Sequence, residues 1–216
     1  MVHVKSSTTT EKFEQLLEEL LSCTEEQVSL WFNANRTQLS LAFLQFLKDT
    51  QITSASVLRD PIRTDQITSY ALRIAKLLSN EPQAKALAQW MRGIWAMHNH
   101  VSQAHVLFRS ALDYYRSTND RLSVAKLSTN LVGVLADTHE NEMAEKYYKE
   151  ARTVFLDYVN ETPQYLIALE QNFGYLLYYW GRYEEALAVH DQTLALAIQY
   201  NLTTHVAEIR VNRHLA

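Results

Sequence analysis

Glycine and proline are scarce in this chain, because its 216 residues include only four glycines and three prolines. A β sandwich or barrel needs many tight reversals, which these two residues supply, so their scarcity argues against an all-β fold. The glycines also fit neither GxGxxG nor GxxxxGK[ST], the patterns that cradle phosphates. The composition therefore predicts a mostly helical protein and excludes nucleotide binding through these two motifs.

Cysteine is rarer still, since Cys23 is the only one. A single cysteine allows no intramolecular disulfide and leaves a cysteine-based zinc site short of ligands. No apolar run has the length of a signal-peptide core or of a bilayer span. We therefore expect a cytoplasmic protein without membrane contact, metal or cofactor, in which Cys23 is a small buried residue and not a nucleophile.

The charge balance gives no excess of basic residues, because 20 Lys and Arg stand against 24 Asp and Glu, a formal net charge of -4. No uniform positive field is available to neutralise nucleic-acid phosphates, so we expect no nucleic-acid partner. His98 and His100, with His105 nearby, lack an adjacent carboxylate or thiolate. They are interpreted as a solvated turn and not as a metal site.

Residues 11–80 carry apolar side chains at three- and four-residue spacing, which is typical of short amphipathic helices. Thr24-Glu-Glu-Gln27 is a capping box, and Asp60-Pro61 is a helix start. The polar residues 1–10 have no period and predict a disordered tail, and a loop is expected around residues 50–59. The pattern predicts an N-terminal helical region over residues 11–80.

Beyond residue 80 one spacing recurs at intervals of roughly 40 residues. Its copies are Ala104-x3-Phe108-x2-Ala111, Ala144-x3-Tyr148-x2-Ala151 and Ala186-x3-His190-x2-Thr193. Each follows a second shared unit: Trp90-Met-Arg-Gly93, Asn130-Leu-Val-Gly133 or Asn172-Phe-Gly174. We predict two-helix repeats near 81–120, 121–162 and 163–202, with the small residues buried where two helices approach closely.

These residues resemble the tetratricopeptide repeat (TPR), whose pattern places a Leu-Gly pair, an aromatic residue and Ala-x3-Phe across a helical hairpin. The stretch from Asn172 to Leu187 matches it best; in the other copies the glycine lies one residue late, and Asn99 or His139 replaces the turn glycine. The resemblance implies an all-α, right-handed superhelical array of antiparallel helix pairs over residues 81–216. Such arrays bind proteins or peptides in a concave groove lined by the first helices of the repeats.

The short N-terminal helices, followed by Ala84-x-Ala86-Leu-Ala88, also resemble the N-terminal arrays of bacterial multidomain proteins that end in a CHAT domain, a caspase-like peptidase fold. This resemblance implies the sensing or recruiting part of a longer signalling or effector protein. No peptidase residues are found here, so we expect no enzyme activity. Residues 203–216 align with the first helix of a fourth, truncated repeat, which predicts self-association through Val206, Ile209 and Leu215 if these stay partly uncovered.

The helical period separates a packed face from an open face in each first helix. Leu127, Leu131 and Leu135, like Leu169, Phe173 and Leu177, are expected inside. The open face of the first repeat is predicted to hold Ala86, Trp90, Gly93 and Met97, with Trp90 covered by residues 39–79. The candidate binding residues on the open faces are Lys126, Asn130, Asp137, Gln171, Asn172, Tyr175, Tyr179 and Asn212.

Two interpretations of these residues remain open. Asn130, Asn172 and Asn212 either hold the backbone of an extended peptide or bond to neighbouring helices and fix the repeat angle. Lys126 favours an acidic group and is similar to part of a carboxylate-holding clamp. Tyr175 and Tyr179 either hold an aliphatic or proline-rich segment or pack on the next repeat. Tyr178, Trp180 and Tyr183 are interpreted as core or turn residues.

The preferred function is a module that binds a protein or peptide partner. One alternative is a structural scaffold whose repeats associate with one another. A second is a peptide-pheromone-type regulator, which needs a helix-turn-helix DNA reader that the acidic N-terminal helices do not convincingly supply.

Overall fold

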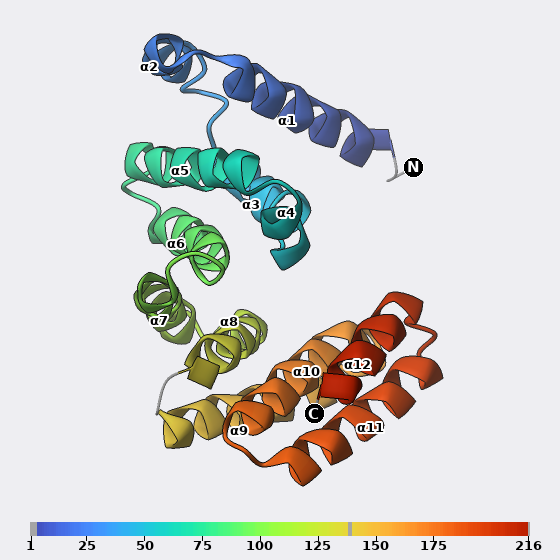
Figure 1. The fold of residues 1–216 in the computed structure, drawn as a ribbon. Coiled ribbons are helices and arrows are strands. Elements are labelled where there is room, and N and C mark those ends of the chain that lie inside the picture. Colours follow the sequence, from blue (N-terminus) through green and yellow to red (C-terminus); the bar gives the residue numbers. More distant parts are fainter. Residues whose placement is uncertain (1–3, 138–139, 216) are drawn as a thin grey trace. The chain divides into compact units, whose positions relative to one another are not determined.

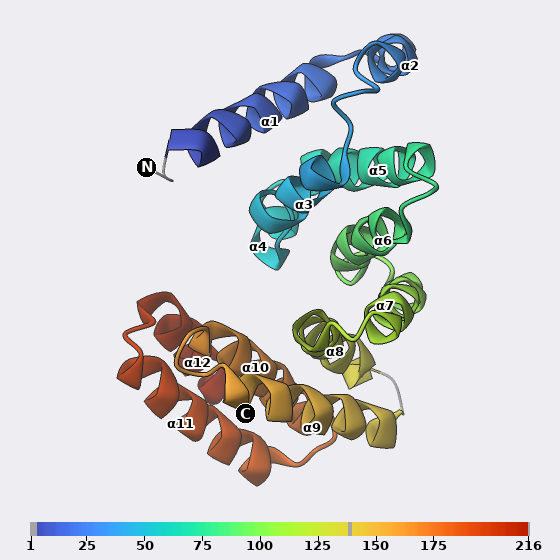
Figure 2. The same cartoon turned by 180° about the vertical axis from the view of Figure 1, so that it is seen from behind.

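The computed structural model describes residues 4–137 and 140–215, and its helices are shown in Figures 1 and 2. Helices take up 83% of the structure, and no strand occurs in the part of the chain that it describes. The predicted all-α class is confirmed, and the helices pack in adjacent pairs. No described helix is long and apolar enough to cross a bilayer.

The chain forms two compact units, residues 1–107 and 108–216. This division falls inside α7, whereas the repeat pattern places its boundary after residue 80. The N-terminal unit contains α1 (Val4–Ser22), α2 (Glu25–Ala34), α3 (Leu41–Thr50), α4 (Ser54–Arg59), α5 (Pro61–Leu77), α6 (Pro82–Ala96) and the first part of α7 (Val101–Ser117).

Two segments of the N-terminal unit differ from the sequence prediction. Helix α1 extends to Val4, although residues 1–10 were expected to be disordered; no Gly or Pro interrupts its extension from the packed turns. Residues 1–3 lie outside the described chain. The expected loop at 50–59 contains α4, which a reciprocal capping box starts: Ser56 N–H donates to Thr53 Oγ1 at 3.0 Å, and Thr53 N–H donates to Ser56 Oγ at 2.9 Å.

Helix α6 packs against α3, α4 and α5. This packing buries Ala86, Trp90 and Gly93, so the open face predicted for them is wrong. The predicted cover over Trp90 is confirmed, because the Lys48 ammonium of α3 lies 4.2 Å from the centroid of its ring. Residues 39–79 supply helices that occupy this face of α6.

The C-terminal unit continues from α7 through a series of paired helices. It contains α8 (Arg121–Val134), the short 3-10 helix η1 (Leu135–Asp137), α9 (Asn141–Asp157), α10 (Pro163–Tyr179), α11 (Tyr183–Gln199) and α12 (Thr203–Leu215). Helix α8 packs on α9 and α10 on α11, while α10 also contacts α8 and α12. Asn119, Gly181 and Asn201 follow α7, α10 and α11 with positive φ, the left-handed conformation that Gly and Asn adopt at helix ends.

The repeated alanines lie in the core as predicted. Ala104, Ala144 and Ala186 are 0% exposed, and the inward leucines of α8 and α10 are buried. The aromatic position beside Ala144 joins α9 to α10, because Tyr148 stacks on Phe173 with ring centroids 3.7 Å apart. The recurring spacing therefore marks close helix packing.

The contact between Gly174 of α10 and His190 of α11 is tight. A Cβ atom at Gly174 would lie 2.6 Å from Cε1 of His190. The imidazole is buried, and its Nδ1 has no hydrogen-bond partner among the described residues. Burial lowers the pKa of His190, so the neutral ring is the form that fits between these helices.

Helix α12 docks on α10 and α11 through Ile209, which is fully buried in a cluster with Ile167 and Ala197. The expectation that Ile209 stays partly uncovered is wrong, because the groove between α10 and α11 accepts it. Val206 is half-buried against the same cluster, whereas Val211 is exposed. The Leu215 side chain lies outside the described residues.

Candidate functional site

The face formed by α8, α10 and α12 carries the residues predicted to bind a ligand. Helix α10 contacts both α8 and α12, so their first-helix faces adjoin as the repeat pattern implies. Tyr175 and Tyr179 are exposed. The half-buried candidates are Lys126, Asn130, Gln171, Asn172 and Asn212. Asp137 ends η1, and its side chain lies outside the described residues.

Asn172 is engaged within the fold. Its Nδ2 donates to the backbone carbonyl of Thr129 at 3.0 Å and thus links α10 to α8. In contrast, Asn130, Gln171 and Asn212 make no side-chain hydrogen bond to any residue that the structure describes. The asparagines therefore do not form a uniform ladder, and the one on α10 acts as a bond between repeats.

Replacing this amide gives a direct test of its role. We expect Asn172→Ala to lower the free energy of unfolding by about 1 kcal/mol, because the Thr129 carbonyl loses its donor. Partner binding should change little. Thermal denaturation checks this result, with Asn130→Ala as the matched control that leaves the melting temperature unchanged. A ligand-contacting Asn172 would show the opposite pattern, with weaker binding and unaltered stability.

Lys126 also has a partner on α10. Its ammonium lies 4.0 Å from the centroid of the Tyr165 ring, a cation-π contact between first helices. The lysine forms no ion pair with a carboxylate in the described chain, so its ammonium is available to an acidic group of a ligand. This position allows Lys126 to bind an acidic group, as predicted, and it also lets Lys126 join α8 to α10.

Four tyrosine side chains gather where α10 ends and α11 begins, and we call them the tyrosine surface: Tyr175, Tyr178, Tyr179 and Tyr183. The hydroxyl oxygens of Tyr175 and Tyr179 are 2.8 Å apart, and their ring centroids 4.7 Å. Tyr178 makes edge contacts with Tyr179 and Tyr183. These rings support one another while three of them remain exposed.

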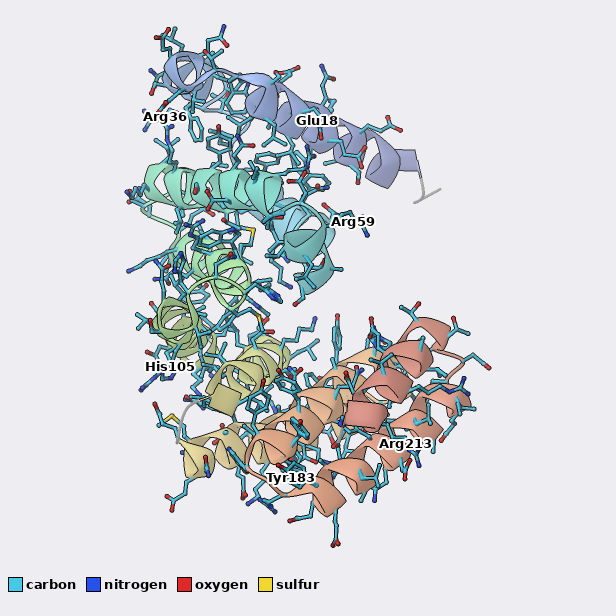
Figure 3. The ribbon with its side chains drawn as sticks, in the orientation of Figure 1. Glu18, Arg36, Arg59, His105, Tyr183 and Arg213 are labelled. Atoms are coloured by element: carbon cyan, nitrogen blue, oxygen red, sulfur yellow. The ribbon has the colours of Figure 1, made fainter. Side chains whose placement is uncertain are left out.

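The sequence prediction left out two members of this surface, because Tyr178 and Tyr183 were interpreted as core or turn residues. Tyr178 is half-buried. Tyr183 begins α11 (Figure 3), and its side chain is 54% exposed. Tyr175 and Tyr179 are 44% and 49% exposed. The spacing of four residues from Tyr175 to Tyr179 to Tyr183 was the available signal, and the intervening Gly181 turn obscured it.

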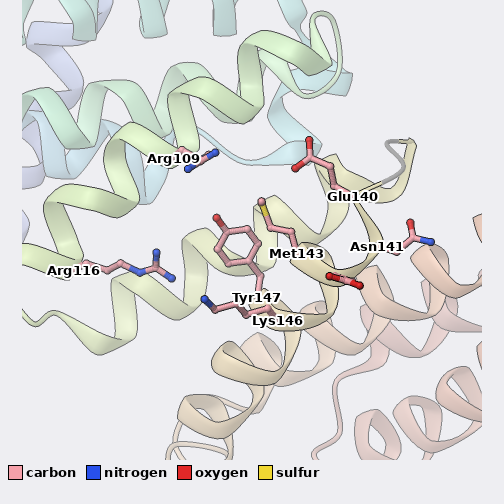
Figure 4. A pocket seen from close by; sticks show the side chains of 8 residues that line it. Arg109, Arg116, Glu140, Asn141, Met143, Lys146 and Tyr147 are labelled. Carbon is pink, nitrogen blue, oxygen red and sulfur yellow. The ribbon is translucent and has the colours of Figure 1, made fainter.

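A pocket of about 810 Å³ lies between α7 and α9, away from the predicted residues (Figure 4). Arg109 and Arg116 enter it from α7. The beginning of α9 contributes its remaining lining residues: Glu140, Asn141, Glu142, Met143, Lys146 and Tyr147. The sequence analysis searched for binding residues only on the first helix of each repeat. It therefore did not consider α7 and α9, which are the second helices of the first two repeats.

Basic groups surround a buried tyrosine in this pocket, which we call the α7/α9 pocket. Arg116 pairs with Glu150 at 2.9 Å, and Lys146 approaches the same carboxylate at 3.9 Å. Arg109 forms no ion pair with any described residue. Burial raises the pKa of Tyr147, and the nearby positive charges of Arg109 and Arg116 act in the opposite direction.

The residues considered for metal or nucleophilic chemistry are not brought together. Among the described residues, no group of three or more His, Cys, Asp or Glu side chains is placed to hold a metal ion. Cys23 is half-buried, and its thiol donates to the Glu19 carbonyl at 3.3 Å.

Compared with known proteins, the chain matches no family profile, no curated protein and no solved structure.

Proposed function

We propose that this chain is a cytoplasmic, TPR-like module that acts by binding a partner protein and not by catalysis. The observation that carries the proposal is the tyrosine surface, where three rings remain exposed although a hydroxyl contact and ring contacts hold them in place. Exposed aromatic groups of this kind are enriched where proteins bind one another, because they bury a large area and lose little side-chain entropy.

The chemistry of the tyrosine surface favours an extended partner segment rich in proline. Proline rings pack on aromatic faces, and the polyproline II backbone leaves its carbonyls without internal hydrogen bonds. Phenol hydroxyls are donors for such carbonyls. The four tyrosines carry no charge, and the adjacent Arg182 is paired with Glu185 at 2.6 Å and with Glu145 at 3.1 Å. This arrangement favours an uncharged segment over an acidic or basic one.

Fluorescence anisotropy with a dye-labelled proline-rich peptide tests this function. Tyr179→Ala is expected to weaken binding about tenfold, equivalent to about 1.4 kcal/mol, because one exposed ring of the surface is lost. Tyr179→Phe should keep most of the affinity. Leu156→Ala, which removes an exposed apolar side chain on α9, is the matched control and should bind like the parent chain.

Two results would contradict the proposal. One is the absence of saturable binding by the parent chain, and the other is equal affinity of the Tyr179→Ala variant with an unchanged melting temperature. Sedimentation of the same samples examines the alternative: concentration-dependent dimers that do not bind peptide would favour a self-associating scaffold.

A further inference from the structure

The α7/α9 pocket has a second chemistry, independent of the tyrosine surface. Tyr147 is only 6% exposed, yet it lines the pocket and has no hydrogen-bond partner among the described residues. Its hydroxyl points toward Arg109 (Figure 4). The hydroxyl oxygen is not one of the buried polar atoms without a partner, so it is accessible from the pocket. A hydroxyl donor that opens into a pocket, beside a guanidinium with no ion pair to a described residue, can bind an anion together with that guanidinium.

Helix α9, which forms one wall of the pocket, also favours a bound anion. The first N–H groups of an α-helix have no acceptor within the helix, and the helix dipole makes this end positive. Four residues at the start of α9 line the pocket: Glu140, Asn141, Glu142 and Met143. The pocket therefore combines the start of α9 with Arg109 and the Tyr147 hydroxyl, three features that each favour negative charge.

The charges that line the pocket limit how negative the ligand can be. Arg109, Arg116 and Lys146 are balanced in part by Glu140 and Glu142 on the same lining and by Glu150, which two of the cations share. A dianionic phosphate would meet repulsion from these carboxylates. The three cations and the three carboxylates balance, so the pocket suits a segment that carries one charge of each sign. A carboxylate of this segment would meet Arg109, and a neighbouring basic group would find an acidic partner in Glu142.

We propose that the α7/α9 pocket binds a partner protein segment in which an acidic side chain lies beside a basic one. The carboxylate accepts hydrogen bonds from Arg109 and the Tyr147 hydroxyl, and the basic side chain lies toward Glu142. The pocket volume of about 810 Å³ is enough for a few side chains. This ligand differs in chemistry from the uncharged segment proposed for the tyrosine surface, so the two sites can be tested separately.

Calorimetric titration of the 216-residue chain with short peptides provides the test. The probe has a central Glu-Lys pair with Gly and Ser on both sides, and its matched versions carry Gln-Lys or Glu-Gln. We expect measurable binding of the Glu-Lys peptide, at least tenfold weaker binding of the Gln-Lys peptide, and an intermediate result for Glu-Gln. Sodium phosphate serves as a competitor and should displace the peptide only through its ionic strength, as sodium chloride does.

Variants of the chain assign the contacts. Arg109→Gln should weaken the Glu-Lys peptide at least tenfold, and Tyr147→Phe severalfold. Glu142→Gln should weaken Glu-Lys but leave Glu-Gln unaffected. Lys149→Gln is the control, because it removes a positive charge from α9 outside the pocket lining, where Lys149 pairs with Glu145 at 3.1 Å.

Several outcomes would overturn the inference. These are no binding of the Glu-Lys peptide, equal binding of the Gln-Lys peptide, or an Arg109→Gln variant that melts and binds like the parent. Displacement by phosphate at concentrations where chloride has no effect would show a phosphate site and contradict the carboxylate assignment.

Discussion

Gly174→Ala is expected to lower the free energy of unfolding by about 1–3 kcal/mol, although alanine is the better helix former. The added Cβ would lie 2.6 Å from Cε1 of His190 and 2.9 Å from Nε2. His190 is 2% exposed, so the ring has no open space into which it can move without separating α10 from α11. Chemical denaturation of the parent and the variant gives the measurement.

A double-mutant cycle isolates this contact. In a His190→Ala background the clash is absent, so Gly174→Ala should then be neutral or stabilising, by up to about 1 kcal/mol. Equal costs in both backgrounds would show that the ring is not the cause. The cycle belongs near pH 8, where His190 is neutral in both states.

The choice of pH follows from the lowered pKa of His190. As the pH falls through about 6.5, the unfolded chain takes up a proton on this side chain before the folded chain does, so stability falls with pH.

Ala144→Leu is the second change with a large expected effect. Ala144 is 0% exposed in α9, which packs on α8, and the additional carbon atoms would push these helices apart. We expect a loss of about 1–3 kcal/mol in the free energy of unfolding. Thermal and chemical denaturation both report it, and Ala186→Leu, at the equivalent place in the next repeat, should behave alike.

An exposed alanine provides the control for this substitution. Ala188 lies on α11 and is exposed, so Ala188→Leu adds the same atoms without overpacking and should shift the melting temperature only slightly. If Ala144→Leu were equally mild, the assignment of Ala144 to a close helix contact would be contradicted.

The helix pairs beyond residue 80 were predictable because each repeat has a small residue at the same position, where two helices approach closely. Buried small residues such as Ala104 and Ala144 follow from helix spacing, as do the inward leucines of α8. The burial of Ala86 and Gly93 was harder to infer, because helices from earlier in the chain pack on this face of α6. Likewise, Ile209 is buried through Ile167 and Ala197, which a helical period within α12 alone does not reveal.

The candidate site was predictable only as far as one helix determines it. The period of α10 correctly placed Tyr175 and Tyr179 on an open face, since exposure along a regular helix follows its geometry. It did not decide that Asn172 bonds to Thr129, because that contact depends on the approach of α8. The exposure of Tyr183 depends on the turn between α10 and α11. The α7/α9 pocket depends on how the second helices of two successive repeats pack. Neither feature produces a periodic pattern in the sequence.

The docking of α12 affects how the C-terminal unit opens under native conditions. Its buried anchor is Ile209, whereas α8, α9 and α10 are also joined by the bond from Asn172 to Thr129 and by the stack of Tyr148 on Phe173. In arrays stabilised by contacts between neighbours, the helix with fewer partners separates first in local fluctuations. Amide hydrogens of α12 would then exchange with solvent while α10 stays closed, and the rings of Tyr175 and Tyr179 would keep their geometry through such openings.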